Sequence, residues 1–171
     1  DEELPEVCAD TPVRLLVSSG TESEPKLVAY SHNALVGGRG RFLQRLHPDG
    51  PSFRGMYLVP LGSSFGSSAT FGVLSWLGGS IALLPQFDVS AAIRAIEELR
   101  PTHLLGVPTM FQRIAADPAL AAVDKSSLRA IVSGGSVIDQ TTIQRCVEAF
   151  GCSFVSLYGS ADGVNCHNTL D

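Results

Sequence analysis

Hydroxyl side chains, one glycine and one lysine gather in the segment "SSGTESEPK", directly after the apolar run "VRLLV". Gly20 lets the backbone turn and approach a ligand closely. Lys26, one of only two lysines in the chain, adds a mobile positive charge. These residue types suit a cradle for phosphate groups, with short donors at Ser18, Ser19, Thr21 and Ser23. A solvated loop of ordinary turn-forming residues is the alternative that the residues leave open.

Two further glycine-bearing segments also follow apolar runs that are typical of buried strands. They are "SGGS" (Ser133–Ser136) and "YGSADG" (Tyr158–Gly163). Ligands of parallel α/β sheets bind beyond the carboxyl ends of the strands. If the strands are neighbours, we expect all three segments to converge on one edge of the sheet. The first segment lacks the spacing G-x-x-x-x-G-K-[ST], which excludes the nucleotide hydrolases that carry that loop.

A competing chemistry is that of a serine hydrolase. The segment "GSSFG" (Gly62–Gly66) matches G-x-S-x-G, in which Ser64 would be the nucleophile. Asp88 and either His103 or His167 would complete the order Ser, Asp, His along the chain. His103, however, opens an apolar run close to Pro101, where a structural role is favoured. This hypothesis also explains neither "SSGTESEPK" nor "YGSADG".

Four motifs in order resemble those of the adenylate-forming superfamily, which includes acyl-CoA ligases, aryl-acid ligases and peptide-synthetase adenylation domains. "SSGTESEPKLV" resembles the signature loop [TS]-S-G-[TS]-[TS]-G-x-P-K-G-V, from which Glu22, Ser23 and Leu27 depart. "PLGSSFG" resembles P-x-x-H-x-x-G with Ser63 in the histidine position, and "LRAIVSGGSVI" resembles the segment that packs on adenine. "LYGSADG" resembles Y-G-x-[TA]-E, with Asp162 in the glutamate position. The run from "FGCSFVSLYG" onward looks closest to aryl-acid ligases.

The resemblance implies that the chain binds ATP/AMP and Mg²⁺. The first loop would wrap the β- and γ-phosphates, Tyr158 would stack on adenine, and Asp162 would help to hold Mg²⁺. Aspartate is one methylene shorter than the family's glutamate. Ser63 and Ser64 would shape the acyl pocket. The nucleotide would contact Ser18, Ser19, Gly20, Thr21, Ser23, Lys26, Gly134, Gly135, Ser136, Tyr158, Gly159, Ser160 and Ala161.

The implied reaction joins a carboxylic acid to AMP and then to a thiol, either of CoA or of a carrier protein. The family also uses an aspartate for the ribose hydroxyls and a reaction lysine in a small C-terminal domain, and neither motif occurs before Asp171. We therefore expect this chain to be a catalytically weak piece of a longer ligase. Its partners would include the downstream domains of the same ligase. A non-catalytic nucleotide-binding domain is a further alternative.

Short apolar runs alternate with stretches of helical period, which predicts an α/β fold with a mostly parallel sheet flanked by helices. Residues 1–12 are expected to form an acidic N-terminal segment, and the family resemblance implies that residues 13–171 form the ATP/AMP-binding core subdomain. The expected strands are Val13–Ser18, Met56–Leu61, Ser80–Pro85, His103–Val107, Leu128–Ser133 and Ser153–Leu157. The expected helices are Asn33–Leu46, Ser67–Leu77, Ser90–Arg100 with Ser90 as its cap, Thr109–Ala116 and Asp139–Phe150.

Composition narrows the class of protein. A 171-residue chain with 44% apolar residues and a net charge of −5 indicates a globular domain and disfavours nucleic acid as a partner. The apolar stretches are too short to span a membrane. Cys8, Cys146, Cys152 and Cys166 lack metal-ligand spacing, which favours reduced thiols, with Cys146 in the core. Together with an acidic start that lacks the features of a signal peptide, this predicts a cytoplasmic protein.

Overall fold

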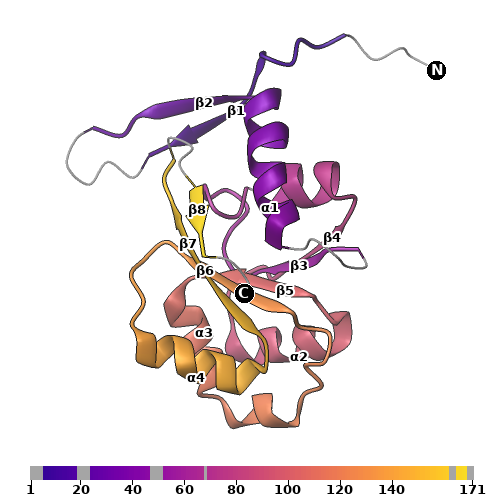
Figure 1. Ribbon diagram of the computed structural model, residues 1–171, viewed down its shortest axis with the longest axis vertical. Helices are drawn as coiled ribbons and strands as arrows, with labels where there is room; N and C mark the ends of the chain where they lie inside the picture. Colours follow the sequence, from indigo (N-terminus) through magenta and orange to yellow (C-terminus); the bar gives the residue numbers. More distant parts are fainter. Residues whose placement is uncertain (1–5, 19–23, 47–51, 68, 162–164, 169–171) are drawn as a thin grey trace.

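The computed structural model describes residues 6–18, 24–46, 52–67, 69–161 and 165–168. Its centre is a six-stranded sheet in the order β4-β3-β5-β6-β7-β8 (Figure 1). The first five strands are parallel, and β8 pairs antiparallel with β7. The predicted α/β class with a mostly parallel sheet is confirmed. The strands are β3 (Arg54–Tyr57), β4 (Ser80–Leu83), β5 (His103–Gly106), β6 (Ala130–Gly134), β7 (Ser153–Gly159) and β8 (Asn165–His167).

Helical segments cover both faces of this sheet. Along each strand the side chains alternate between the faces, so Leu104 and Ile131 pack towards one helical layer and Leu105 and Val132 towards the other. The first layer contains α2 (Val89–Leu99), α3 (Pro108–Ala115), the short 3₁₀ turn η3 (Pro118–Ala122) and α4 (Gln140–Phe150). The second contains α1 (Gly40–Leu46) and the π-helical segment η2 (Ala69–Trp76), and another π-helical segment, η1 (Asn33–Arg39), leads directly into α1.

Two details of the predicted helices are wrong. The cap of α2 is Asp88, whose carboxylate accepts a hydrogen bond from the Ala91 N–H at 2.8 Å, and Ser90 lies inside the helix. The helical period of the sequence also predicts that Leu99 and Val147 face the core, which is wrong, because they are 52% and 37% exposed. The buried positions of α4 are spaced by four residues, which turns Val147 away from the sheet; they are Thr142, Cys146 and Phe150.

The first predicted strand belongs to a different sheet. β1 (Pro12–Val17) pairs antiparallel with β2 (Leu27–Ser31) in a separate hairpin, drawn in indigo and violet in Figure 1. Only Leu16 of β1 is buried, so the prediction of a buried strand in the main sheet over Val13–Ser18 is wrong. The strand β2 was missed because "LVAYS" is short and directly precedes a helical pattern. "SSGTESEPK" therefore joins two antiparallel strands.

Candidate functional site

The carboxyl edge of the main sheet brings two of the three polar segments together. β6 and β7 are paired neighbours, so "SGGS" and "YGSADG" leave the sheet side by side, as predicted. A Cβ on Gly134 would lie 3.1 Å from the carbonyl oxygen of Leu157, and Gly135 has a φ of +85°. Only glycine adopts that conformation without strain. The edge therefore presents bare backbone beside β7.

Tyr158 stands at the end of β7, directly opposite Cys166 of β8. Its side chain is 69% exposed, so its ring is accessible to a ligand. Ser160 and Ala161, which follow it, are half-buried. Asp162 lies outside the described residues, and its predicted contact with Mg²⁺ stays a prediction.

The hairpin reaches the same edge from outside the sheet. The hydroxyl of Tyr30 donates a hydrogen bond to the backbone carbonyl of Ala161, which belongs to the segment after β7. Arg14 Nη2 donates to the carbonyl of Leu61, 3.2 Å away, in the loop after β3. Sequence reasoning missed both residues. The sequence signal for them was weak: Arg14 is a single arginine in one apolar run, and Tyr30 is a single tyrosine in another.

The ends of the "SSGTESEPK" loop are held together. The Lys26 N–H donates to Ser18 Oγ, and the Ser18 N–H donates to the Lys26 carbonyl, both over 2.9 Å. The side chain of Lys26 is left exposed beside this closure. The predicted phosphate contacts of Ser19, Gly20, Thr21 and Ser23 fall outside the described residues.

The loop after β3 forms a tight turn. Ser63 Oγ donates to the Pro60 carbonyl at 2.7 Å and accepts from the Gly66 N–H at 2.9 Å. A Cβ on Gly66 would lie only 2.0 Å from the Pro60 carbonyl oxygen, so this position requires glycine. Ser64 is half-buried in the same turn. The Ser63 hydroxyl serves the turn itself, and a role for Ser63 and Ser64 in an acyl pocket stays a prediction.

The geometry contradicts the place of His103 in the serine-hydrolase constellation, and it gives Asp88 a structural role. His103 is buried at the amino end of β5, opposite to the edge from which the Ser64 loop emerges. Its ring nitrogens lie 2.9 Å from Thr102 Oγ1 and 3.0 Å from the Leu46 carbonyl, and the ring stacks on Phe53. Asp88 caps α2. His103 is therefore structural, as its place beside Pro101 suggested.

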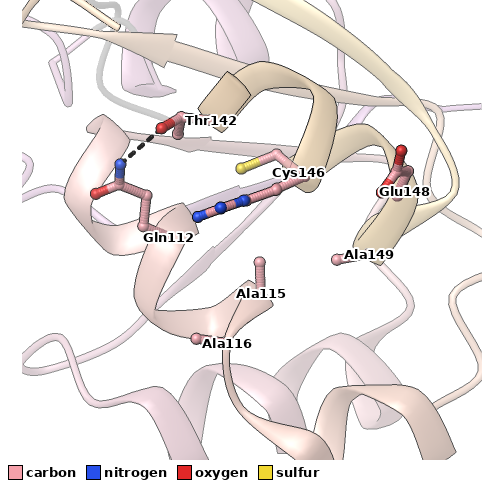
Figure 2. Close-up of a pocket in the computed structure, with 8 residues that line it drawn as sticks. Gln112, Ala115, Ala116, Thr142, Cys146, Glu148 and Ala149 are labelled. Atoms are coloured by element: carbon pink, nitrogen blue, oxygen red, sulfur yellow. Dashed lines mark hydrogen bonds between the residues drawn. The ribbon is translucent and has the colours of Figure 1, made fainter. Parts of the chain in front are cut away.

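A separate cavity of about 620 Å³ lies between α3 and α4. Figure 2 shows the hydrogen bond at one end of it, from Gln112 Nε2 to Thr142 Oγ1 over 2.9 Å, and the thiol of Cys146 in its wall. Burial raises the pKa of that thiol above its ordinary value. None of the predicted site residues that the structure describes lines this cavity, so it is distinct from the described part of the candidate site at the sheet edge.

Two absences hold for the part of the chain that the structure describes. Within it, no three His, Cys, Asp or Glu side chains group together in a way that could hold a metal ion. Within the same residues, no helix is long and apolar enough to cross a membrane.

Comparisons with known proteins agree with this arrangement. The chain is 31% identical over 159 residues to an indoleacetate–CoA ligase from Aromatoleum aromaticum, covering 92% of this chain and 31% of that protein. It is 26% identical over 166 residues to a fatty acid–[acyl-carrier-protein] ligase from Streptomyces coeruleorubidus, covering 94% of this chain and 31% of that ligase. Its fold matches the ATP-bound RpMatB-BxBclM chimera B1 with a TM-score of 0.81 and 25% identity, over 96% of this chain and 32% of the chimera.

The chain thus spans about a third of the length of these relatives. The family described as "AMP-binding enzyme" matches residues 1–169, nearly the whole sequence. The motifs that resemble the adenylate-forming superfamily, the α/β fold and the relatives all agree. The chain belongs to the AMP-binding enzyme family, of which it represents an N-terminal portion.

Proposed function

We propose that this chain is the phosphate- and adenine-binding part of an ATP-dependent ligase that activates a carboxylic acid as its adenylate. The activated acyl or aryl group then passes to the thiol of CoA or of a carrier protein. Relatives of both kinds, a CoA ligase and a carrier-protein ligase, support this thiol-acceptor class.

The contact between Tyr30 and Ala161 is the observation that carries the proposal. It joins the hairpin that bears "SSGTESEPK" to the loop that bears "YGSADG", although the two residues lie 131 positions apart. A nucleotide needs its phosphates and its base to be bound at once, by groups that are fixed relative to each other. The sheet edge and the hairpin provide the two halves of such a site.

In the proposed reaction, a carboxylate oxygen attacks the α-phosphorus of ATP, the bond to the bridging oxygen breaks, and pyrophosphate leaves. The protein mainly positions the reactants and neutralises charge. The exposed Lys26 would hold the β- and γ-phosphates, and the ring of Tyr158 would stack on adenine beside Gly134, Gly135 and Ser136. A magnesium ion bound near Asp162 would supply charge neutralisation on the phosphate oxygens.

A substitution at Lys26 tests the phosphate site. Lys26→Ala should weaken the binding of ATP·Mg, because it removes the cation at the mouth of the proposed loop, while the exposed position leaves folding unchanged. Loss of one charge-assisted contact predicts a Kd about 10-fold higher. Isothermal titration calorimetry measures it, with Arg94→Ala as the control, since Arg94 is an exposed cation on α2. Equal affinities of Lys26→Ala and the unaltered chain would remove Lys26 from the site.

Pyrophosphate exchange with a panel of aryl and acyl acids tests the reaction itself, in the natural protein that contains these residues. Acid-dependent exchange supports the ligase. ATP binding without exchange would indicate a non-catalytic nucleotide-binding domain. A fluorophosphonate probe should leave Ser64 unlabelled, because His103 is buried at the opposite edge of the sheet and the Asp88 carboxylate caps α2. Labelling of Ser64 would revive the hydrolase hypothesis.

A further inference from the structure

Arg14 and Tyr30 are direct cross-strand partners in the hairpin, and so they lie on the same face of it. Each side chain donates a hydrogen bond to the backbone of a different loop: Arg14 to the carbonyl of Leu61 and Tyr30 to that of Ala161. One pair of residues on the hairpin therefore connects it to two separate loops at the carboxyl edge of the main sheet.

The two carbonyls that accept these bonds belong to loops of the proposed site. Leu61 belongs to the turn that the Ser63 hydroxyl closes, so its carbonyl is presented by a tightly wound loop. Ala161 follows directly after Tyr158, Gly159 and Ser160, which are the proposed adenine-binding residues. Because both acceptors are main-chain atoms, each bond fixes the position of a loop backbone.

The hairpin can transmit this position to the phosphate loop. Tyr30 is 5% exposed and packs with Leu16 and Leu35, so its ring is held in place and its hydroxyl works away from bulk water. From the Arg14–Tyr30 pair the ladder continues without a break to the Val17–Leu27 pair. The mutual hydrogen bonds of Ser18 and Lys26 then close the loop at its base.

We propose that Arg14 and Tyr30 are positioning residues that hold the phosphate loop at a set distance from the adenine loop and the acyl-pocket loop. This inference rests on the proposed function for the identity of those loops. The two residues have separable roles. Tyr30 aligns the phosphate and adenine halves of the ATP site, whereas Arg14 aligns the hairpin with the loop over Pro60–Gly66, where the acid is expected to bind.

Conservative variants of the natural protein test these roles by steady-state pyrophosphate exchange. Tyr30→Phe keeps the packed ring and loses the hydroxyl, and it should raise KM for ATP by about two- to tenfold, the effect of one net hydrogen bond. Its KM for the acid should stay within about twofold. Arg14→Met keeps the aliphatic stem and should show the opposite pattern, while Arg14→Lys should restore part of the loss because it retains a donor. Arg94→Met is the matched control and should change neither KM.

Equal rises in both KM values for both variants, together with lower thermal midpoints, would show a merely structural role and overturn the inference. Unchanged KM values would overturn it as well. Absence of exchange in the unaltered protein would contradict the proposed function instead. In that case, hydrogen–deuterium exchange still tests whether Tyr30 positions the phosphate loop. Tyr30→Phe should speed exchange at the amides of Ser18 and Lys26, and unchanged exchange there would refute the positioning role.

Discussion

At the scale of single residues, the candidate site depends strongly on side chains that are small or absent. Gly135 must be glycine because its φ is +85°, and a Cβ on Gly134 would make a tight contact of 3.1 Å with the Leu157 carbonyl oxygen. Glycine at position 135 is therefore required by the backbone of the β6 turn, whether or not a nucleotide binds there. Tyr158 differs, since no packing of the ring accounts for an aromatic side chain that is 69% exposed.

The four cysteines should fall into two classes of reactivity. Cys8 and Cys166 are exposed, whereas Cys146 is buried, and burial raises the pKa of the Cys152 thiol to about 12. Since the thiolate is the reactive form, N-ethylmaleimide at pH 8 should label Cys8 and Cys166 in the native chain and the other two only after denaturation. Peptide mass spectrometry identifies the labelled residues. Rapid labelling of Cys152 without denaturant would contradict the raised pKa of this partly buried thiol.

At the scale of elements, local capping explains why the helices begin where they do. Asp88, Asp117 and Asp139 each accept a backbone N–H in the first turn of α2, η3 and α4. Gly151 ends α4 in the left-handed conformation, a common helix stop. α3 differs: it begins with Pro108, whose missing N–H needs no partner. The start of α3, next to the candidate site, is therefore set by Pro108.

The Asp139 cap should make the stability of α4 depend on pH. Hydrogen bonds from the side chain and N–H of Thr142 lower the pKa of Asp139 below its ordinary value of 3.8. A carboxyl group whose pKa is lower in the folded than in the unfolded state stabilises the fold at pH values above its unfolded-state pKa. This stabilisation is lost as the pH falls through the folded-state pKa. Asp139→Ala should therefore lower the urea midpoint at pH 7, by an amount that shrinks below pH 3.8.

Asp139→Asn is the control for that experiment, because its amide oxygen can still accept the Thr142 N–H but does not titrate over this range. At pH 7 the urea midpoint of Asp139→Asn should be higher than that of Asp139→Ala. A difference between the aspartate and alanine proteins that stays constant down to strongly acidic pH would contradict the capping role.

At the scale of the whole molecule, the hairpin has two unequal faces. The inner face carries Arg14, Leu16 and Tyr30 against the body of the protein. The outer face is apolar and open to solvent, with exposed fractions from 39% to 71%; it carries Val13, Leu15, Val17 and Leu27. A two-stranded sheet also presents unpaired edges, which favour pairing with another chain. Such an exposed apolar face favours association with other molecules.

We expect the 171-residue chain to self-associate through that outer face as its concentration rises. Replacing Leu15 and Leu27 together by threonine keeps residues that suit strands but removes apolar surface, so the double variant should remain monomeric at higher concentration. Sedimentation velocity over a concentration series measures the difference. Leu99→Thr, which alters a leucine that is 52% exposed at the end of α2, should have no effect. If all three proteins associate alike, the hairpin face is not the contact.

The sequence alone determined the class of fold and the polar segments of the site, because these depend on patterns within a few residues. Apolar runs and helical periods located the five parallel strands and their helices, and "SGGS" and "YGSADG" marked the ends of β6 and β7. The motif "SSGTESEPK" was recognisable from residue types. The sequence did not show which elements this motif joins, since a polar loop after an apolar run can be followed either by a helix or by a second strand.

Only the tertiary structure decided how that loop meets the sheet. The hydrogen bonds that fix it join residues 47 and 131 positions apart, and they end on backbone carbonyls, which every residue type possesses. No local pattern reports such a pairing, because the acceptor leaves no trace in the amino-acid types. Burial of Tyr30 against Leu16 and Leu35 likewise depends on where the hairpin docks. Propensity and periodicity act within an element, whereas the relation between elements is set by packing and by bonds that form after the chain has folded back on itself.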